Sequence, residues 1–370
     1  MAPAGSEAGR AVTGWAATVL GVAGIVGVAL VGCGSDRAEE PGDGVTVPDG
    51  FEIDEVVSGL DGPTQVQVLD DGRLLVAQLN GDEGEPGGQV LIVDPESGER
   101  SVVVDGLVSP TGVAAVGDDL WVMEQRRLSH GSLASGELET VIDELPFNGR
   151  SEGTLTALDD GRLLYNTSGT ITSNRAADGS GALWAIDGSG TGEPEVVAVG
   201  FKNAYGRTVG SDGRLWQAEV ADGSFDGEPA PDELVALPPS VLDDGAAGGS
   251  GAGSALDAGW PRCIGDRAPV AQYGGTTEVC ADTVGAQATF EPGATPTSVA
   301  VSPWDDDTLL VALWNDGRVV SVSADPADQG AEPTTWLTGL DHPQHLVADG
   351  DRLLVVDFSG GRILSVERSS

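Results

Sequence analysis

Short apolar runs, each preceded by an acidic or glycine-containing turn, recur along the chain after residue 50. The decapeptides LDDGRLLVAQ at 69–78 and LDDGRLLYNT at 158–167 are nearly identical. Four further segments share their design: VGDDLWVMEQ, GSDGRLWQAE, WDDDTLLVAL and DGDRLLVVDF. Because Asp-Gly between two apolar segments is a strong hairpin signal, each copy predicts a turn that leads into a β-strand.

Further strands are expected on both sides of these turns. Alternating segments such as TQVQVL and GTLTAL lie upstream, and apolar segments such as GQVLIVD, GALWAID and GRILSVE lie downstream. The runs centre near residues 75, 121, 164, 216, 310 and 354. Regular repetition without a helical period favours a propeller over a pair of β-sandwiches. We therefore predict an all-β, six-bladed β-propeller, with the two decapeptides in blades one and three.

The same pattern predicts the domain organisation. The last unit reaches the C-terminus after three strands, and GFEIDEVVSGL at 50–60 supplies an outer strand that joins the last blade and closes the ring. The propeller is then expected over 50–370. The one long gap between copies holds the Gly/Ala-rich run DDGAAGGSGAGSALD and two cysteines, and it predicts an insertion at about 219–292.

The first 33 residues have the pattern of a targeting segment. Arg10 precedes a long apolar run that ends at Leu30-Val31-Gly32-Cys33, which indicates a lipoprotein signal peptide over 1–33 with Cys33 lipidated. An uncleaved membrane anchor is the alternative, because the run is long enough to span a bilayer. Either interpretation places the protein at the cell membrane, facing outside the cytoplasm, with 34–49 as a flexible tether.

Two further cysteines, Cys263 and Cys280, are separated by a short loop. In an exported chain the simplest expectation is one disulfide between them, since a zinc site would need more ligands nearby. The formal net charge of −41 argues against nucleic acid as a partner, because phosphate binding requires a basic face. Such acidity indicates a solvated surface or affinity for divalent cations.

Function is expected where the repeat departs from its own pattern. Four inner strands begin alike, with Pro-Thr or Pro-Gln, at residues 63, 110, 296 and 343. Blades three and four instead carry Arg150-Ser151-Glu152-Gly153 and Lys202-Asn203, and Lys202 is the only lysine of the chain. Inner strands start at the mouth of the central channel, so we predict a ligand site there. Surface charge without a function is the alternative.

These segments resemble a known family. VGFKNAYGRTVGSDGRLWQAEVADG at 199–223, PDEL and DAGWPRCIGD are similar to the soluble quinoprotein glucose/sorbosone dehydrogenases, and the first and last blades match in the same way. The resemblance implies a six-bladed propeller that oxidises sugars with pyrroloquinoline quinone (PQQ) and calcium. It covers essentially residues 50–370 and is strongest over 199–266.

The catalytic position of the family is altered in this chain. The resemblance places a histidine general base at the start of blade three, where this sequence has Arg150. An arginine stays protonated and cannot take the substrate proton. His345, in the last blade, is the only obvious replacement base.

The cofactor clamp of the family is also incomplete. The family's Arg-Asn pair becomes Lys202-Asn203, with Arg207 nearby as a third cation at the mouth. The arginines that hold the cofactor carboxylates fall near His342 and His345, a pair that is also a candidate metal site.

For calcium, the resemblance points to Asp232-Glu233. A second candidate is the acidic loop ADGSFDGEPAPDE, with Asp222, Asp226 and Glu228 as oxygen ligands.

Two functions remain open at this point. One is an exported oxidoreductase that oxidises a sugar or polyol with PQQ through a degenerate site. The other is a non-catalytic cell-surface propeller that binds a carbohydrate or another small polar molecule. Arg150 at the base position favours the second.

Overall fold

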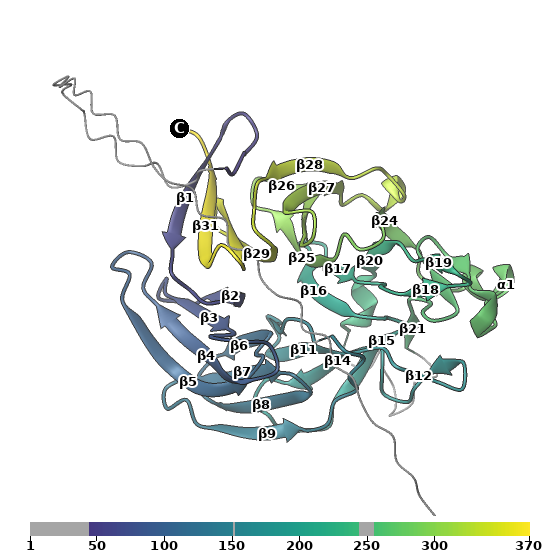
Figure 1. The fold of residues 1–370 in the computed structure, drawn as a ribbon, viewed down its shortest axis with the longest axis horizontal. Helices are drawn as coiled ribbons and strands as arrows, with labels where there is room; N and C mark the ends of the chain where they lie inside the picture. The colour runs from purple at the N-terminus through teal and green to yellow at the C-terminus, as the bar shows by residue number, and fades with distance from the viewer. Residues whose placement is uncertain (1–43, 151, 244–254) are drawn as a thin grey trace, which may run out of the picture. The chain divides into compact units, whose positions relative to one another are not determined.

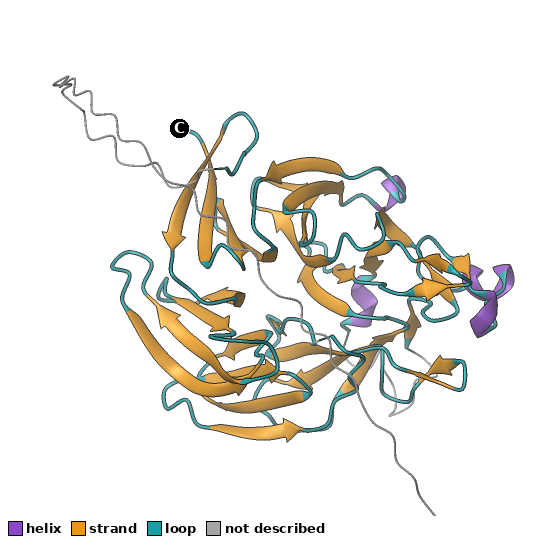
Figure 2. Cartoon of the chain, in the orientation of Figure 1, coloured by secondary structure: helices purple, strands orange, loops and turns teal. Residues whose placement is uncertain are grey.

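The computed structural model describes residues 44–150, 152–243 and 255–370, which belong to one compact unit. Cys33 and the predicted signal peptide lie outside the described residues. Strands dominate the described chain, with only short helical turns between them (Figure 2). Within the described part, no helix combines the length and the apolar character that a membrane span requires.

The described strands form six sheets that follow one another around a central axis (Figure 1), which confirms the predicted all-β, six-bladed propeller. The inner strands of blades one to six are β2 (Pro63–Val68), β6 (Gly112–Val116), β10 (Thr156–Ala157), β16 (Ala204–Val209), β25 (Pro296–Ser302) and β29 (Pro343–Asp349). The second strands are β3 (Leu74–Gln78), β7 (Asp119–Glu124), β11 (Arg162–Thr167), β17 (Leu215–Glu219), β26 (Asp305–Leu313) and β30 (Arg352–Asp357). The third strands are β4 (Pro86–Val93), β8 (Arg127–Ser132), β14 (Ala182–Asp187), β20 (Asp232–Leu237), β27 (Arg318–Ser323) and β31 (Arg362–Arg368). The outer strands are β5 (Arg100–Val108), β9 (Leu138–Ile142), β15 (Glu195–Val199), β24 (Ala286–Phe290), β28 (Thr334–Thr338) and β1 (Phe51–Val57).

The ring closes as the sequence predicts. β1 pairs antiparallel with β31, with Ile53 opposite Val366, and becomes the outer strand of blade six. The segment before β1 differs from the expected flexible tether over 34–49. In its described part, Thr46 forms a bridge to Thr338 of β28, and Val45 and Val47 pack against apolar side chains of blades five and six.

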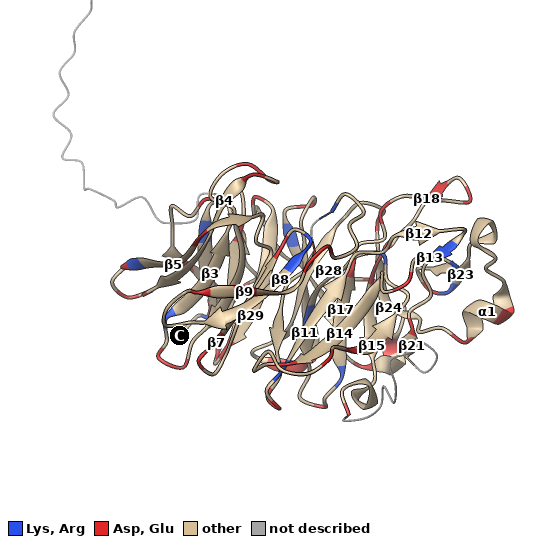
Figure 3. Cartoon of the chain, turned by 90° about the horizontal axis from the view of Figure 1, so that it is seen from below, with Lys and Arg blue, Asp and Glu red and all other residues tan. Residues whose placement is uncertain are grey.

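The repeated Asp-Gly-Arg sequence is a turn device. In blade one the Asp71 carboxylate accepts hydrogen bonds from the backbone N–H and from Nε of Arg73, at 3.1 and 2.8 Å. Asp160 and Arg162 make the same contacts in blade three, at 3.0 and 2.9 Å. The glycine between them has a positive φ, which few other residues adopt. The two decapeptides are therefore nearly identical because both form the same turn. Figure 3 shows Asp and Glu, in red, in many loops of the molecule.

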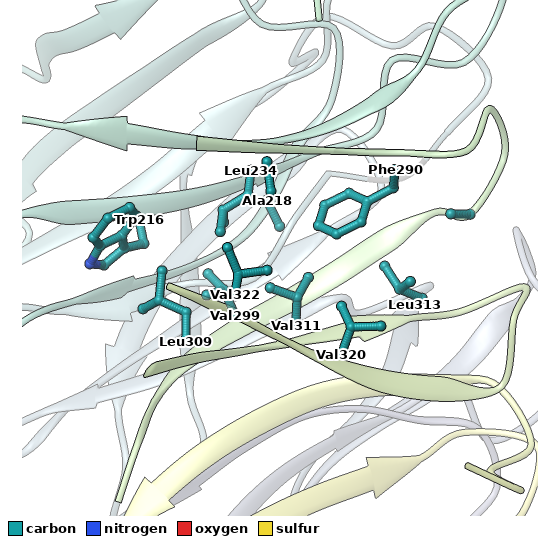
Figure 4. Close-up of a cluster of buried hydrophobic side chains, with 12 residues drawn as sticks. Trp216, Ala218, Leu234, Phe290, Val299, Leu309, Val311, Leu313, Val320 and Val322 are labelled. Carbon is teal, nitrogen blue, oxygen red and sulfur yellow. The ribbon is translucent and has the colours of Figure 1, made fainter. Parts of the chain in front are cut away.

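The hydrophobic core lies between neighbouring blades. Because side chains alternate along a strand, Leu309, Val311 and Leu313 of β26 pack toward blade four, whereas Leu310 and Ala312 pack toward blade six. Figure 4 shows the first of these interfaces. Each second strand is therefore apolar on both faces, which is why the sequence shows continuous apolar runs there.

The predicted insertion at about 219–292 is not one block. β20 and β24 within it belong to blade four, so two separate excursions leave the blade on either side of β20. The excursions contain β18 (Ser224–Phe225), β19 (Glu228–Pro229), β21 (Leu256–Asp257), β22 (Cys263–Ile264), β23 (Ala268–Pro269) and α1 (Thr277–Ala281). The predicted disulfide between Cys263 and Cys280 is present. Blade three carries an extra hairpin, β12 (Ile171–Thr172) and β13 (Arg175–Ala176).

Candidate functional site

A cavity of about 360 Å³ lies where the inner strands begin, at the predicted mouth of the channel. We call it the mouth cavity. Its lining is mostly uncharged and polar or aromatic: Thr64, Leu79, Glu83, Thr111, Gly149, Arg150, Asn203, Tyr205, Val220, Thr295, Thr297, Trp314, Asn315, Gln344 and Phe358. Its size lies within the range of small-molecule sites.

The carboxylate of Asp222 contacts polar side chains at the start of blades three and four. Asp222 lies 2.8 Å from Nε of Arg150, accepts a hydrogen bond from Nδ2 of Asn203 at 3.2 Å, and lies 3.9 Å from Nζ of Lys202. Burial lowers the pKa of Lys202, while the nearby carboxylates act against that shift. The structure therefore brings Arg150, Lys202 and Asn203 together around the single carboxylate of Asp222, which forms a close ion pair with Arg150 and a longer one with Lys202.

The opposite wall of the mouth cavity is aromatic and amide-rich. Gln344 donates a hydrogen bond from Nε2 to the hydroxyl of Tyr205 at 2.5 Å, and the rings of Trp314 and Phe358 lie 4.8 Å apart. Sequence reasoning missed these residues. A positional signal was available, because Leu79, Val220, Trp314 and Phe358 each directly follow a second strand and all line the cavity.

The structure separates the two histidines of blade six. His342 lies beside the mouth cavity, with Nδ1 2.9 Å from Oγ of Ser359 and its ring tilted by 35° against that of Trp314, which lines the cavity. His345 is buried and lines a different cavity. They do not form a metal pair, because the inner strand carries His345 down the channel and away from the mouth.

That second cavity, about 640 Å³, is lined by the later halves of the inner strands, and we call it the lower cavity. Burial, and to a smaller extent the charge of Arg207, lower the pKa of His345 to about 3. A base this weak, on the other cavity, does not replace the missing base at the mouth. Gln65 lies between the two ends, where it bonds to backbone groups of Val113 and Leu155 in the next two blades.

Arg207 does not belong to the mouth either, in contrast to the clamp role expected for it. Its guanidinium is buried in the channel wall, and its five N–H groups lie within hydrogen-bond distance of six acceptors, four backbone carbonyls and the amide oxygens of Asn166 and Gln217. Burial lowers its pKa to about 9. With its donors directed at blades three and four, Arg207 holds the two inner strands together rather than a ligand carboxylate.

Glu152, two residues after Arg150 in the sequence, also lies outside the lining of the mouth cavity. Glu152 is fully buried, and its Oε2 accepts a hydrogen bond from the backbone N–H of Arg126 at 3.0 Å. Burial raises its pKa to about 7. Among the described residues, Glu83 is the one carboxylate that lines the mouth cavity, and neither Glu152 nor His345 lines it.

The expected calcium pair Asp232-Glu233 is split between two faces of β20, because successive strand residues point in opposite directions. Both oxygens of Asp232 accept backbone N–H groups, from Ala221 and Thr295, each at 2.8 Å. Glu233 instead lies opposite Glu219 of β17. Burial raises the pKa of Glu233 to about 8 and that of Glu219 well above its usual value.

Glu219 and Glu233 line one small internal void of about 10 Å³, and Oε2 of Glu219 has no hydrogen-bond partner among the described residues. The pair fits calcium only as two of the oxygen ligands that the ion takes, so backbone carbonyls would have to supply the others. The acidic loop does not converge on an ion, since Asp226 accepts backbone N–H groups of Ala271 and Gln272. Within the described chain, no cluster of three or more His, Cys, Asp or Glu side chains is arranged to hold a metal.

A six-bladed propeller with a cavity of ligand size at one end of its channel is a common architecture for recognition of small molecules. No protein-family model matches the chain. No curated protein matches it either. Solved structures do match: the PQQ domain of a pyranose dehydrogenase from Coprinopsis cinerea in its holo form has a TM-score of 0.67 at 18% identity, over 88% of this chain and 97% of that one.

A PQQ-bound aldose sugar dehydrogenase from Streptomyces coelicolor gives a TM-score of 0.65 at 19% identity, over 87% of this chain and 99% of the other. A calcium structure of a Trichoderma reesei carbohydrate-active enzyme of family AA12 gives 0.70 at 17% identity, over 90% and 100%. The chain therefore has the fold of the PQQ-dependent sugar dehydrogenases, as the sequence resemblance implied.

Proposed function

We propose that the protein binds a neutral sugar or polyol in the mouth cavity and is at most a weak PQQ-dependent dehydrogenase. The observation that carries the proposal is the charge balance at Asp222. Arg150 is the one cationic side chain among the described lining residues, and it is already paired with that carboxylate. Amides, hydroxyl groups and the rings of Trp314 and Phe358 make up most of the rest, and these suit the hydroxyl edge and C–H face of a sugar ring.

PQQ fits this cavity poorly. The cofactor carries three carboxylates, and the chain as a whole has a net charge of −41, so local cations would have to hold it. Arg150 and Lys202 share the carboxylate of Asp222, which leaves at most one net positive charge there; Arg207 lies away from the mouth, and the lining includes Glu83. With His345 on the other cavity as well, we derive no oxidation step.

Calcium is retained as a structural proposal at Glu219 and Glu233. Calcium would remove the mutual repulsion of the two buried carboxylates, which otherwise disfavours ionisation of both. We expect millimolar CaCl₂ to raise the melting temperature of the protein by a few degrees, and to have no such effect on Glu233→Gln. An equal calcium response in both proteins would contradict this site.

The lipid anchor at Cys33 is a proposal that rests on the sequence motif. We expect Cys33→Ala to move the protein out of the membrane fraction. Retention of the variant in that fraction would favour the uncleaved apolar anchor instead.

The test of the mouth cavity is calorimetric titration with D-glucose. We expect Asn315→Trp, which places an indole in the cavity from an exposed turn, to weaken binding at that site at least tenfold. Asp316→Trp is the matched control, because Asp316 lies in the same turn but not in the lining. Equal effects of both variants would refute the site. Robust sugar oxidation after addition of PQQ and calcium would refute the weak-dehydrogenase half of the proposal.

A further inference from the structure

A second groove, of about 550 Å³, lies on the flank of blade three, outside the channel. We call it the side groove. Its walls come from two segments that are not part of the propeller repeat. One is the β12–β13 hairpin with the residues that follow it, and the other is the segment 257–262. The third and outer strands of blade three, β14 and β15, form its floor through Trp184, Val196 and Val199.

Both walls are held in place by specific contacts. The buried hydroxyl of Ser180 lies 3.1 and 2.9 Å from the backbone carbonyl oxygens of Thr170 and Ala177, and its single proton bonds one of them, which fixes the base of the hairpin. Ala176 of β13 packs against the cluster that contains Trp260. On the other side, Asp257 accepts hydrogen bonds from the backbone N–H of Gly259 and from Nη2 of Arg262, at 2.8 and 2.6 Å. The groove is therefore a built feature and not a gap between loose loops.

The charges of the groove are balanced in pairs. Arg262 pairs with Asp257 on one wall, and Arg175 pairs with Asp178 on the other, at 2.6 and 2.8 Å. An ionic ligand would meet a carboxylate beside every guanidinium. Each pair still offers unused donors next to acceptors, because a guanidinium has five N–H groups. Adjacent donors and acceptors of this kind suit the neighbouring hydroxyl groups of a sugar.

The floor supplies the complementary apolar surface. The indole of Trp184 lines it, with its Nε1 donating to Oγ1 of Thr167 at 3.3 Å, and Val196 and Val199 lie alongside. An aromatic ring presents a flat apolar face, and a saccharide ring has C–H groups on one face and hydroxyl groups at its edge. We propose that the side groove is a second binding site, separate from the mouth cavity, for a neutral mono- or disaccharide.

The test uses calorimetric titration with cellobiose and with D-glucose, in a protein whose mouth cavity is closed by Asn315→Trp. We expect saturable binding of at least one of these sugars to remain. Adding Ala177→Trp, which fills the groove from the hairpin, should weaken that binding at least tenfold. Adding Ile171→Trp should leave it unchanged, because this exposed residue belongs to the same hairpin but not to the groove lining.

The outcomes separate the two sites. If Asn315→Trp alone abolishes all binding of both sugars, or if Ala177→Trp has no effect, the side groove proposal is overturned, whereas the mouth proposal is judged by its own comparison of Asn315→Trp with Asp316→Trp. Should Ala177→Trp fail to fold, Arg262→Ala replaces it, since this side chain is 43% exposed. It should weaken binding at least fivefold, and unchanged binding would again overturn the proposal.

Discussion

The two ends of the central channel are built from the same six inner strands but differ in how they hold cations. At the mouth, Arg150 and Lys202 meet the carboxylate of Asp222, and Arg150 remains half-exposed. In the channel wall, Arg207 is buried among carbonyl and amide oxygens, and none of its partners among the described residues is a carboxylate. The position of an arginine in the channel thus decides whether it lines the mouth cavity or joins two blades.

The largest expected effect tests this difference directly. Arg207→Ala removes a donor from six acceptors in the channel wall, of which Asn166 and Tyr205 keep another, so we expect the free energy of unfolding to fall by at least about 3 kcal/mol. Arg150→Ala removes a half-exposed ion pair and should cost at most about 1 kcal/mol. Urea unfolding of both variants measures the contrast, and similar losses would show that it is false.

The next prediction compares the two histidines. Because the folded state keeps His345 neutral down to a pKa of about 3, the unfolded chain binds this proton first, with an ordinary pKa of 6.5. Its contribution to stability is present above pH 6.5 and is lost as the pH falls toward 3. Between pH 7.5 and pH 5 the loss is about 2 kcal/mol.

His345→Gln should remove this part of the pH dependence in urea unfolding curves. Glu233, whose pKa burial raises to about 8, acts in the opposite sense. Its contribution falls as the pH rises from 4.5 to 8, so the effect must be measured as a difference from the wild-type protein. His342→Gln is the control, since this side chain lies at the mouth. An unchanged slope in His345→Gln would contradict the burial argument.

The smallest expected effect concerns the mouth alone. Asp222→Asn keeps an oxygen for hydrogen bonding but removes the charge that compensates Arg150 and Lys202. We expect PQQ to bind at least tenfold more tightly to this variant, about 1.4 kcal/mol, in an absorbance titration. Asp316→Asn is the matched control, because Asp316 pairs with Arg318 outside the cavity. Equal affinity in Asp222→Asn and the wild-type protein would mean that Asp222 does not set the charge preference.

The fold could be predicted from the sequence because the same pattern of turn and apolar strand recurs in every blade. Each unit carries an acidic or glycine-containing turn before an apolar second strand, and the strand missing from the last blade is visible at 50–60. The extent of the insertion was harder to predict, because β20 and β24 share the polar and glycine-rich surroundings of the loops beside them.

Residues of the mouth could be predicted from the sequence only where they interrupt the local repeat pattern. Arg150 and Lys202-Asn203 followed from departures in the repeat, but Asp222 lies 72 residues from Arg150 and contacts it through the arrangement of two blades. The partnership of Glu219 and Glu233 depends on the register of β17 and β20. The one sequence signal of this pair was Glu219, a charged residue at the end of the largely apolar segment LWQAE. His345 was misjudged because the depth of a residue in a channel has no local pattern.

The pairing of β1 with β31 has a consequence for biogenesis. The ribosome makes β1 before any blade exists, yet its only partner strand in the described sheets is completed at the far end of the chain. Blades one to five can form in order as they emerge, whereas blade six cannot be completed until β31 has been made. A nascent chain therefore carries an unpaired β1 until that point. A chain that stopped before β31 would leave β1 as an aggregation-prone strand edge.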